Sequence, residues 1–433
     1  MDFRPDEAFA LSLDKADPLA SMRGEFLIPP AWAVTGRPGD THASVYLTGN
    51  SLGCQPKAVA AALKQDLDDW ANFGVEGHTH GKHPWLPAHE FCRSAAASLV
   101  GALAHEVVIM NSLTVNLHLL MVAFYRPTGE RYKIMIEDSA FPSDSYAVGS
   151  QTAFHAPMAG FDPAGAVVRL KARVGEETLR TEDVVAAIER EGTSLALVML
   201  SGVNYLTGQW FDMPAITKAG HAAGATVGWD LAHAAGNVPL ALHDLGADFA
   251  AWCSYKFLNG GPGAVGGAFV HERHVARGDL VQFAGWWGNS PEGRFKMGST
   301  FTPVASADRF QLSNPPIFSL TPVRESLAMF ARVGMPALRA KAEKLTGYLE
   351  WMVDSLPGRP VNIITPREPK ERGCALSLVF AKGAKAAMAA LKEAGAICDF
   401  REPNVIRAAP VPMYNSFHDV YRFATILRQA TAP

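Results

Sequence analysis

The feature that most constrains the fold is an alternation of short apolar runs and helical patterns through the middle of the chain. Residues 132–138 (YKIMIED), 194–202 (SLALVMLSG) and 225–230 (ATVGWD) are β-rich, whereas residues 182–191 and 213–224 have the apolar spacing of helices. Strands that alternate with helices and are almost continuously apolar are typical of a parallel sheet covered on both faces. We therefore predict an α/β fold with a mainly parallel central sheet flanked by helices.

One long irregular segment divides the rest of the chain. Residues 282–316 are rich in Gly, Pro, Ser and aromatic residues, and loops of this length in compact domains are usually functional or lie at an interface. A helical stretch and a shorter α+β pattern follow it. We predict an N-terminal arm with helices over residues 1–69 that packs with the small domain, a large α/β domain over 70–311 and a smaller α+β domain over 312–433.

Composition excludes several classes of protein. The 433 residues are 48% hydrophobic and 19% charged, as in globular proteins. A net charge of −3 without basic runs gives no reason to expect nucleic acid or an anionic membrane as partner. The first 20 residues lack the regions of a signal peptide, and no stretch approaches the roughly 18 apolar residues of a membrane span.

The cysteines indicate a reducing compartment. Five are scattered along the chain and never spaced C-x-x-C: Cys54, Cys92, Cys253, Cys374 and Cys398. This usage fits free thiols better than a disulfide framework or a zinc site. We expect a cytoplasmic protein of the size of an enzyme.

Two charged residues stand at the ends of predicted apolar strands. Asp230 ends the run 225–230, and Lys256 follows the next run, 248–254. Open α/β sheets bind ligands at the carboxyl ends of their strands. Asp230 can also be read as the cap of a following helix, and the two residues as a structural ion pair. A lysine and a carboxylate are, however, what pyridoxal phosphate needs, since the lysine forms a Schiff base and the acid keeps the pyridine nitrogen protonated.

The same part of the chain offers a phosphate site and an aromatic cover. Ser112 and Thr114 precede a helical run, and N–H groups at a helix start bind phosphate without a cationic side chain. Taken alone, an ordinary Ser/Thr cap explains them better. Phe141 precedes a proline turn that Asp144 closes. An aromatic at this position can cover a cofactor ring or simply plug the turn.

Other motifs indicate no competing chemistry. The glycine run over residues 260–267 follows a lysine and precedes a strand, so it has the order of neither a P-loop nor a dinucleotide loop. His78, His80 and His83 have no partnering cysteines or carboxylates at ligand spacing, and we expect no metal there. The G-x-S-x-G signature of serine hydrolases does not occur.

Over most of its length the chain resembles the kynureninase family of pyridoxal phosphate enzymes, which has the aspartate aminotransferase fold (fold type I). The segments that carry the resemblance are YLTGNSLGCQPKAV, EGHTHGKHPW, NSLTVNLHLLM, AFPSDSYA, LSGVNYLTGQ, GWDLAHAAGNV, WCSYKFLNGGPG, GWWG, RFKM, QLSNPPI and VIRAAPVPMYNSFHDVYRF. The resemblance implies hydrolysis of the Cβ–Cγ bond of L-kynurenine or 3-hydroxy-L-kynurenine to an anthranilate and L-alanine, in tryptophan catabolism. It also implies a homodimer with shared active sites, and leaves open whether the pathway leads to NAD synthesis.

The resemblance also implies a role for individual residues. It makes Lys256, Tyr255 and Asp230 catalytic. It gives cofactor contacts to Leu113, Thr114, Phe141, Pro142, Ser143, Asp144, Ser201, Asp230, His233, Tyr255, Lys256, Trp286 and Asn314. It gives substrate contacts to Ser51, His78, Ser313, Asn314, Arg401 and Arg407. Trp286 and Asn314 match positions that the family supplies across a dimer interface, and Arg407 matches the arginine that clamps the substrate carboxylate.

Two further expectations concern specificity and rival functions. His78, Ser313 and Asn314 are polar and would surround the aniline ring, so we expect 3-hydroxykynurenine to be preferred. The nearest rival is another fold type I enzyme, such as a cysteine desulfurase-like lyase, but no cysteine lies in an obvious exposed glycine or serine loop. A non-catalytic regulator is disfavoured because Lys256, Asp230, Tyr255 and Arg407 occur together.

Overall fold

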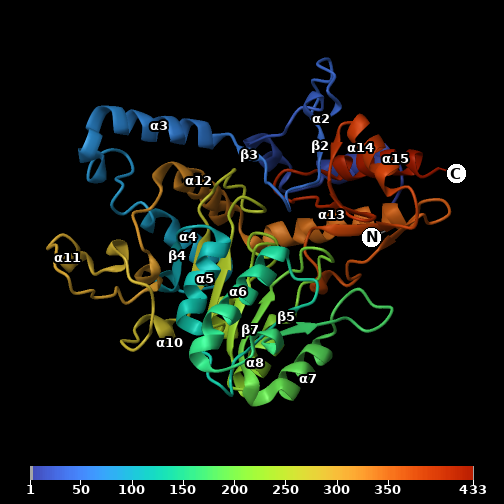
Figure 1. Cartoon of the computed structure of the whole chain (residues 1–433). Helices are drawn as coiled ribbons and strands as arrows, with labels where there is room; N and C mark the ends of the chain where they lie inside the picture. Colours follow the sequence, from blue (N-terminus) through green and yellow to red (C-terminus); the bar gives the residue numbers. More distant parts are fainter. Residues whose placement is uncertain (1–2, 433) are drawn as a thin grey trace.

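The computed structural model describes residues 3–432 and is organised around a seven-stranded sheet of order β4-β10-β9-β8-β7-β5-β6 (Figure 1). Its strands are β4 (Val107–Ile109), β5 (Lys133–Glu137), β6 (Val167–Leu170), β7 (Leu195–Ser201), β8 (Thr226–Asp230), β9 (Phe249–Trp252) and β10 (Gly267–Val270). The strands from β6 to β9 run parallel, whereas β10 is antiparallel to both β9 and β4. The predicted mainly parallel sheet is confirmed.

The antiparallel strand has a simple cause. Helices connect the parallel strands, but residues 253–266 join β9 to β10 without one. A connection that does not cross over the sheet returns the chain in the opposite direction. This loop contains Lys256, so the reversal of the chain places the lysine at the carboxyl end of the parallel strands.

Helices cover both faces of this sheet. One face packs against α5 (Leu113–Phe124) and α6 (Pro142–Ala159), and the other against α4 (Glu90–Val100), α7 (Thr181–Glu191), α8 (Met213–Ala222) and α12 (Ile317–Val333). Successive strand residues alternate between the two cores: Ile134 and Ile136 face α5 and α6, and Met135 faces the opposite layer. Strands buried on both faces explain the continuous apolar runs in the sequence.

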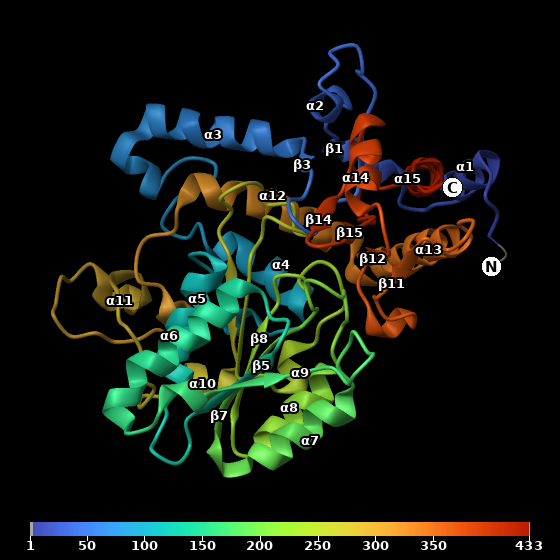
Figure 2. The same ribbon diagram turned by 45° about the vertical axis from the view of Figure 1, so that its right-hand side comes forward.

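A smaller antiparallel sheet, of order β11-β12-β15-β14, lies beyond the large one (Figure 2). Its strands are β11 (Val361–Ile363), β12 (Leu376–Phe380), β14 (Asp399–Arg401) and β15 (Val405–Ala408). The helices packed with it are α13 (Met335–Asp354), α14 (Ala384–Glu393), α15 (Phe417–Ala430) and the N-terminal α1 (Glu7–Lys15). The strand β2 (Val45–Tyr46) pairs with β13 (Ala396–Ile397) in a separate two-stranded sheet.

The remaining elements are short, apart from one long helix. They are β1 (Phe26–Leu27), β3 (Gln55–Pro56), α2 (Trp32–Thr35), α3 (Ala58–Phe73), α9 (Leu242–Leu245), α10 (Glu272–Val275) and α11 (Pro291–Arg294). The long helix α3 packs against α12, which also contacts α4 on the large sheet. The division of the chain after residues 69 and 311 stays a prediction. Within residues 3–432, no helix combines the length and the apolar character needed to cross a bilayer.

Candidate active site

The carboxyl ends of the parallel strands bring polar side chains to one edge of the large sheet. β5 ends at Glu137, β7 at Ser201 and β8 at Asp230, and the register pairs Ser201 with Asp230. Lys256 lies just beyond the end of β9, the neighbour of β8. The structure thus brings together residues that are far apart in the sequence.

A cavity of about 200 Å³ lies at this edge. Its lining residues are Ser112, Leu113, Thr114, Phe141, Ser143, Asp144, Ser201, Val203, Tyr205, Asp230, Ala232, His233, Tyr255 and Lys256. It therefore gathers all of the expected cofactor-site residues except Pro142, Trp286 and Asn314. Their individual roles stay predictions.

The amine of Lys256 lies among His233 and two aromatic rings. Its Nζ is 3.0 Å from His233 Nε2, 5.8 Å from the centre of the Phe141 ring and 5.9 Å from that of Tyr255. Burial and the charge of Lys256 hold the pKa of His233 well below its usual value. The imidazole is therefore neutral, and its Nε2 accepts a hydrogen bond from the lysine.

Two buried carboxyl groups line the cavity beside the lysine. Asp230 accepts a hydrogen bond from the N–H of Ala232 at 2.7 Å, so it caps the turns that follow β8 and also lines the cavity. Burial and the neighbouring charge of Asp230 raise the pKa of Asp144 well above its usual value. Asp144 therefore keeps its proton to a higher pH than an exposed aspartate does. Its Oδ1 is buried and has no hydrogen-bond partner among the described residues.

Two helix starts converge on the other wall of the cavity. The first turns of α5, after Ser112, and of α6, after Phe141, have no side-chain cap hydrogen bond. The two starts are joined by Thr114 Oγ1 and Ser143 Oγ, 2.7 Å apart. Free N–H groups and aligned helix dipoles at such starts bind phosphate.

Pyridoxal phosphate fits the residues present. A lysine amine, an adjacent carboxylate, an aromatic ring and two uncapped helix starts face one cavity, and Asp144 leaves a buried oxygen unpaired there. Lys256 would hold the cofactor covalently, Asp230 its pyridine nitrogen, and Thr114 with Ser143 its phosphate.

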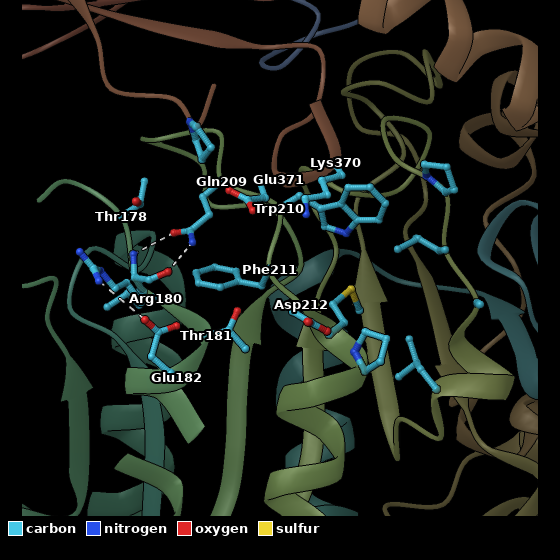
Figure 3. Close-up of a pocket in the computed structure, with 18 residues that line it drawn as sticks. Thr178, Arg180, Thr181, Glu182, Gln209, Trp210, Phe211, Asp212, Lys370 and Glu371 are labelled. Atoms are coloured by element: carbon cyan, nitrogen blue, oxygen red, sulfur yellow. Dashed lines mark hydrogen bonds and ion pairs between the residues drawn. The ribbon is translucent and has the colours of Figure 1, made fainter. Parts of the chain in front are cut away.

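A larger cavity of about 610 Å³ lies elsewhere, between the starts of α7 and α8 and the loop around Lys370 (Figure 3). On one wall Arg180 lies 3.8 Å from Glu182, and the side chain of Gln209 bonds to the backbone of Leu179. Its polar groups are mostly paired with one another or exposed. The chemistry expected from the sequence belongs to the smaller cavity.

The two arginines expected to bind substrate lie next to the ring of Tyr205, which lines the cavity. The guanidinium groups of Arg401 and Arg407 sit 6.0 and 5.8 Å from the centre of this ring. Both bond to Asp399, and the Nε atom of each is buried without a partner among the described residues. Burial lowers the pKa of Arg407 to about 10, so its charge is retained at neutral pH.

The other predicted residues are not brought to the cavity within one chain. Ser51, Trp286, Ser313 and Asn314 are exposed. His78 lies at the end of a short turn, where its Nδ1 is 2.8 Å from the carbonyl oxygen of Val75. Their predicted roles stay predictions; those of Trp286 and Asn314 are expected to be supplied across a dimer interface.

Two residues of the site were not singled out from the sequence. Tyr205 lies within a segment quoted for the family resemblance, but no role was attached to it. Glu137 is 2% exposed and accepts hydrogen bonds from the N–H and the hydroxyl of Ser201. The signal that identified Asp230, an acid at the end of an apolar strand, was equally present at Glu137.

Comparison with known proteins gives one consistent result. Residues 338–427 match the family model "Kynureninase C-terminal domain". The kynureninase of Myxococcus xanthus is 57% identical over 98% of this chain and 97% of its own, and that of Koribacter versatilis is 55% identical over 97% of both.

Solved structures of similar fold are more distant. A cysteine desulfurase from Escherichia coli has 18% identity and a TM-score of 0.74, covering 95% of this chain and 98% of its own. The C-DES enzyme, with glycine covalently linked to its pyridoxal phosphate, has 17% identity and a TM-score of 0.72, covering 89% and 96%. These likenesses establish fold type I, and the predicted fold class is confirmed.

The cysteines do not support desulfurase chemistry. All five are buried. Burial raises the pKa of four of their thiols to about 12: Cys54, Cys92, Cys374 and Cys398. A reactive cysteine needs an accessible thiolate, so the likeness to the desulfurases is one of fold.

The raised pKa of Asp144 predicts a specific pH dependence of stability. The folded protein keeps this proton above the ordinary aspartate pKa of about 3.9, whereas the unfolded chain loses it, so stability falls by up to about 1.4 kcal/mol per pH unit as pH rises between the two values. Asp144→Asn removes this penalty. In cofactor-free protein, the free energy of unfolding of the variant relative to that of the wild type should increase as pH rises above about 4.

Asp138→Asn is the matched control, because Asp138 is an exposed aspartate that directly follows β5. Its stability curve should run parallel to that of the wild type. A difference between Asp144→Asn and wild type that does not change with pH would contradict the protonated state of Asp144.

Proposed function

Since this chain belongs to the kynureninase family, and is thus a pyridoxal phosphate-dependent hydrolase of carbon–carbon bonds in ketonic substances, we propose which of its residues cleave kynurenine and which substrate it prefers. The cleavage of kynurenine serves tryptophan catabolism. The observation that carries the assignment of residues is the cavity shared by Lys256, Asp230 and the two uncapped helix starts.

The reaction consumes one water and divides the substrate between two products. Water supplies the hydroxyl of the new carboxyl group on the anthranilate, and L-alanine receives a proton at its Cβ. When bound, pyridoxal phosphate supplies an electron sink for the bonds broken at Cα and between Cβ and Cγ. The protein must therefore hold the cofactor, move protons and position the γ-carbonyl for water.

Lys256 and Tyr255 are the proposed proton carriers. Lys256 removes the proton from the substrate Cα once its amine is free, and neutral His233 stays within hydrogen-bond distance of it. Burial raises the pKa of Tyr255, so its phenol stays protonated and can donate to the substrate during the hydrolytic half. Asp230 would hold the pyridine nitrogen of the cofactor with its carboxylate.

Binding of the substrate carboxylate is assigned to Arg407. Its guanidinium is buried but charged, and its Nε lacks a partner among residues 3–432. A planar guanidinium binds a carboxylate through two hydrogen bonds. Asp399 holds the group in place and competes with the substrate for it.

We place the active enzyme in the cytoplasm, in keeping with five free thiols, and as a homodimer with shared sites. Around Trp286, the side chains of Phe283, Phe295 and Met297 are 59%, 58% and 79% exposed. Clustered apolar exposure of this kind is typical of a protein interface. A second copy at this surface would bring Trp286 and Asn314 towards a neighbouring cavity.

Loss of the lysine amine should abolish both colour and turnover. Purified protein should be yellow, and borohydride treatment should remove the absorption band that gives this colour. Lys256→Ala should be colourless and cleave kynurenine at least ~10³-fold more slowly, because both the attachment and the proton carrier are gone. Release of fluorescent anthranilate measures the rate. Lys218→Ala, which removes an exposed lysine of α8, should behave as wild type. A colourless Lys256→Ala that still cleaves kynurenine normally would refute the mechanism.

The polar surroundings expected for the aniline ring predict the substrate preference. His78, Ser313 and Asn314 offer hydrogen bonds to a ring hydroxyl, which plain kynurenine leaves unmet. The ratio of kcat/KM should favour 3-hydroxykynurenine by at least about tenfold, and Ser313→Ala should reduce it. A clear preference of the wild type for plain kynurenine would sink this proposal.

Shared sites can be tested by mixing two inactive variants. Lys256→Ala lacks a residue of its own cavity, and Asn314→Leu one supplied to the partner. Subunit exchange between them rebuilds one complete site in each mixed dimer, so about a quarter of wild-type activity should return at equal concentrations. Absence of recovery, with exchange verified by differently tagged subunits, would mean that each site is built from one chain.

A further inference from the structure

A second cluster of ionisable side chains lies at the other end of the strands of the large sheet, away from the carboxyl ends of the parallel strands. Glu106 immediately precedes β4, His271 follows β10, and His243 belongs to α9. β4 and β10 are antiparallel, with Val107 opposite Phe269, so Glu106 and His271 meet at this edge. In Figure 1, α10, which follows His271, marks this end, away from α3 and α12.

The spacing of the three side chains suits a metal ion. Glu106 Oε1 is 3.0 Å from His243 Nδ1 and 3.7 Å from His271 Nδ1, and one ligand atom from each residue lies within 4.8 Å of the others. Zinc bonds of about 2.0–2.2 Å in tetrahedral geometry put ligand atoms roughly 3.3 Å apart. Small side-chain rotations would bring all three to that spacing.

The carboxylate is already held as metal-bound carboxylates are. Glu106 is fully buried, its Oε2 accepts the N–H of Leu103 at 2.8 Å, and its Oε1 accepts that of Glu272 at 2.7 Å. Such backbone donors fix the orientation of a ligand and raise its affinity for metal. The imidazole rings of His243 and His271 stack above it, with their centres 5.0 Å apart.

The protonation of the two imidazoles is compatible with metal binding. His271 Nδ1 accepts the N–H of Arg273 at 3.2 Å, so this nitrogen carries a lone pair. Burial lowers the pKa of His271, whereas the hydrogen bond to Glu106 raises that of His243. A metal ion would have to displace the proton of His243 and the contact with Arg273.

A neighbouring cluster is less suited to a metal ion, because its carboxylate is already paired with a cation. Asp248 accepts hydrogen bonds from His221, His274, Arg273 and the N–H of Val227. Its carboxylate is neutralised by the Arg273 guanidinium. Glu106 has no cation of this kind among its hydrogen-bond partners in the described chain.

We propose that Glu106, His243 and His271 bind one divalent transition-metal ion of the zinc class, with a fourth position open to water. Two imidazoles and one carboxylate suit zinc or cobalt, whereas calcium and magnesium prefer oxygen ligands. The ion would tie the start of β4, the end of β10 and α9 together. The ion would lie at the opposite end of the strands from the catalytic cavity, and it would take no part in the cleavage.

Chelator-treated holoenzyme titrated with zinc, in competition with a chromogenic chelator, tests this site. One zinc per chain should bind, and cobalt should give the visible bands of a tetrahedral ion. His243→Ala and His271→Ala should each lose at least about tenfold in zinc affinity. His221→Ala, the matched control at Asp248, should keep it. Kynurenine cleavage should be unchanged in all three variants.

Melting temperature gives a second readout that separates binding from folding. Zinc should raise the Tm of wild type and His221→Ala but not of His243→Ala. If either alanine variant fails to fold, Glu106→Gln and His243→Gln replace it. Absence of stoichiometric zinc binding, or equal affinity in all variants, would overturn the proposal and leave a structural histidine–glutamate contact only. Equal loss in His221→Ala would overturn it too.

Discussion

The packing of buried carboxyl groups beside one lysine amine is the constraint on which the catalytic edge depends. Asp230 ends β8, Glu137 ends β5 and Asp144 lies in the first turn of α6, and all three are buried. Ionised acids are costly in such surroundings, so the pKa of Asp144 is raised and Glu137 accepts hydrogen bonds from Ser201. The uncapped starts of α5 and α6 add positive potential on the opposite wall. These arrangements leave a cavity suited to an anionic, ring-shaped cofactor.

Much of this edge could be predicted from local sequence. Apolar runs located β5, β7 and β8, and the rule that parallel strands bind ligands at their carboxyl ends brought Asp230 and Lys256 together. The antiparallel direction of β10 could not be predicted from these runs, because it depends on the path that residues 253–266 take between β9 and β10. Tyr205 depends on tertiary packing with Phe141 and Arg407, which no local pattern encodes.

The positions of Trp286 and Asn314 expose a second limit of sequence reasoning. Both are exposed in one chain, and only the family resemblance assigns them to a site. The solved structures share the fold at 17–18% identity but include desulfurases, whose chemistry needs a reactive cysteine. Here every cysteine is buried. The shared fold therefore accounts for the arrangement of the strands and helices, and the surrounding side chains decide the reaction.

The pKa values of buried acids shift in opposite directions at the two ends of the strands. Burial alone would raise the pKa of Asp248, but hydrogen bonds from His221, His274 and Arg273 lower it overall. The pKa of Glu106 is lowered likewise by His243 and backbone N–H groups. At the catalytic edge, burial raises the pKa of Asp144, and its acidic neighbours raise it further. Acids that are ionised and held by backbone donors suit a cation, whereas an acid kept protonated beside a lysine suits proton transfer. One rigid sheet thus separates a reactive edge from an edge organised around fixed negative charge.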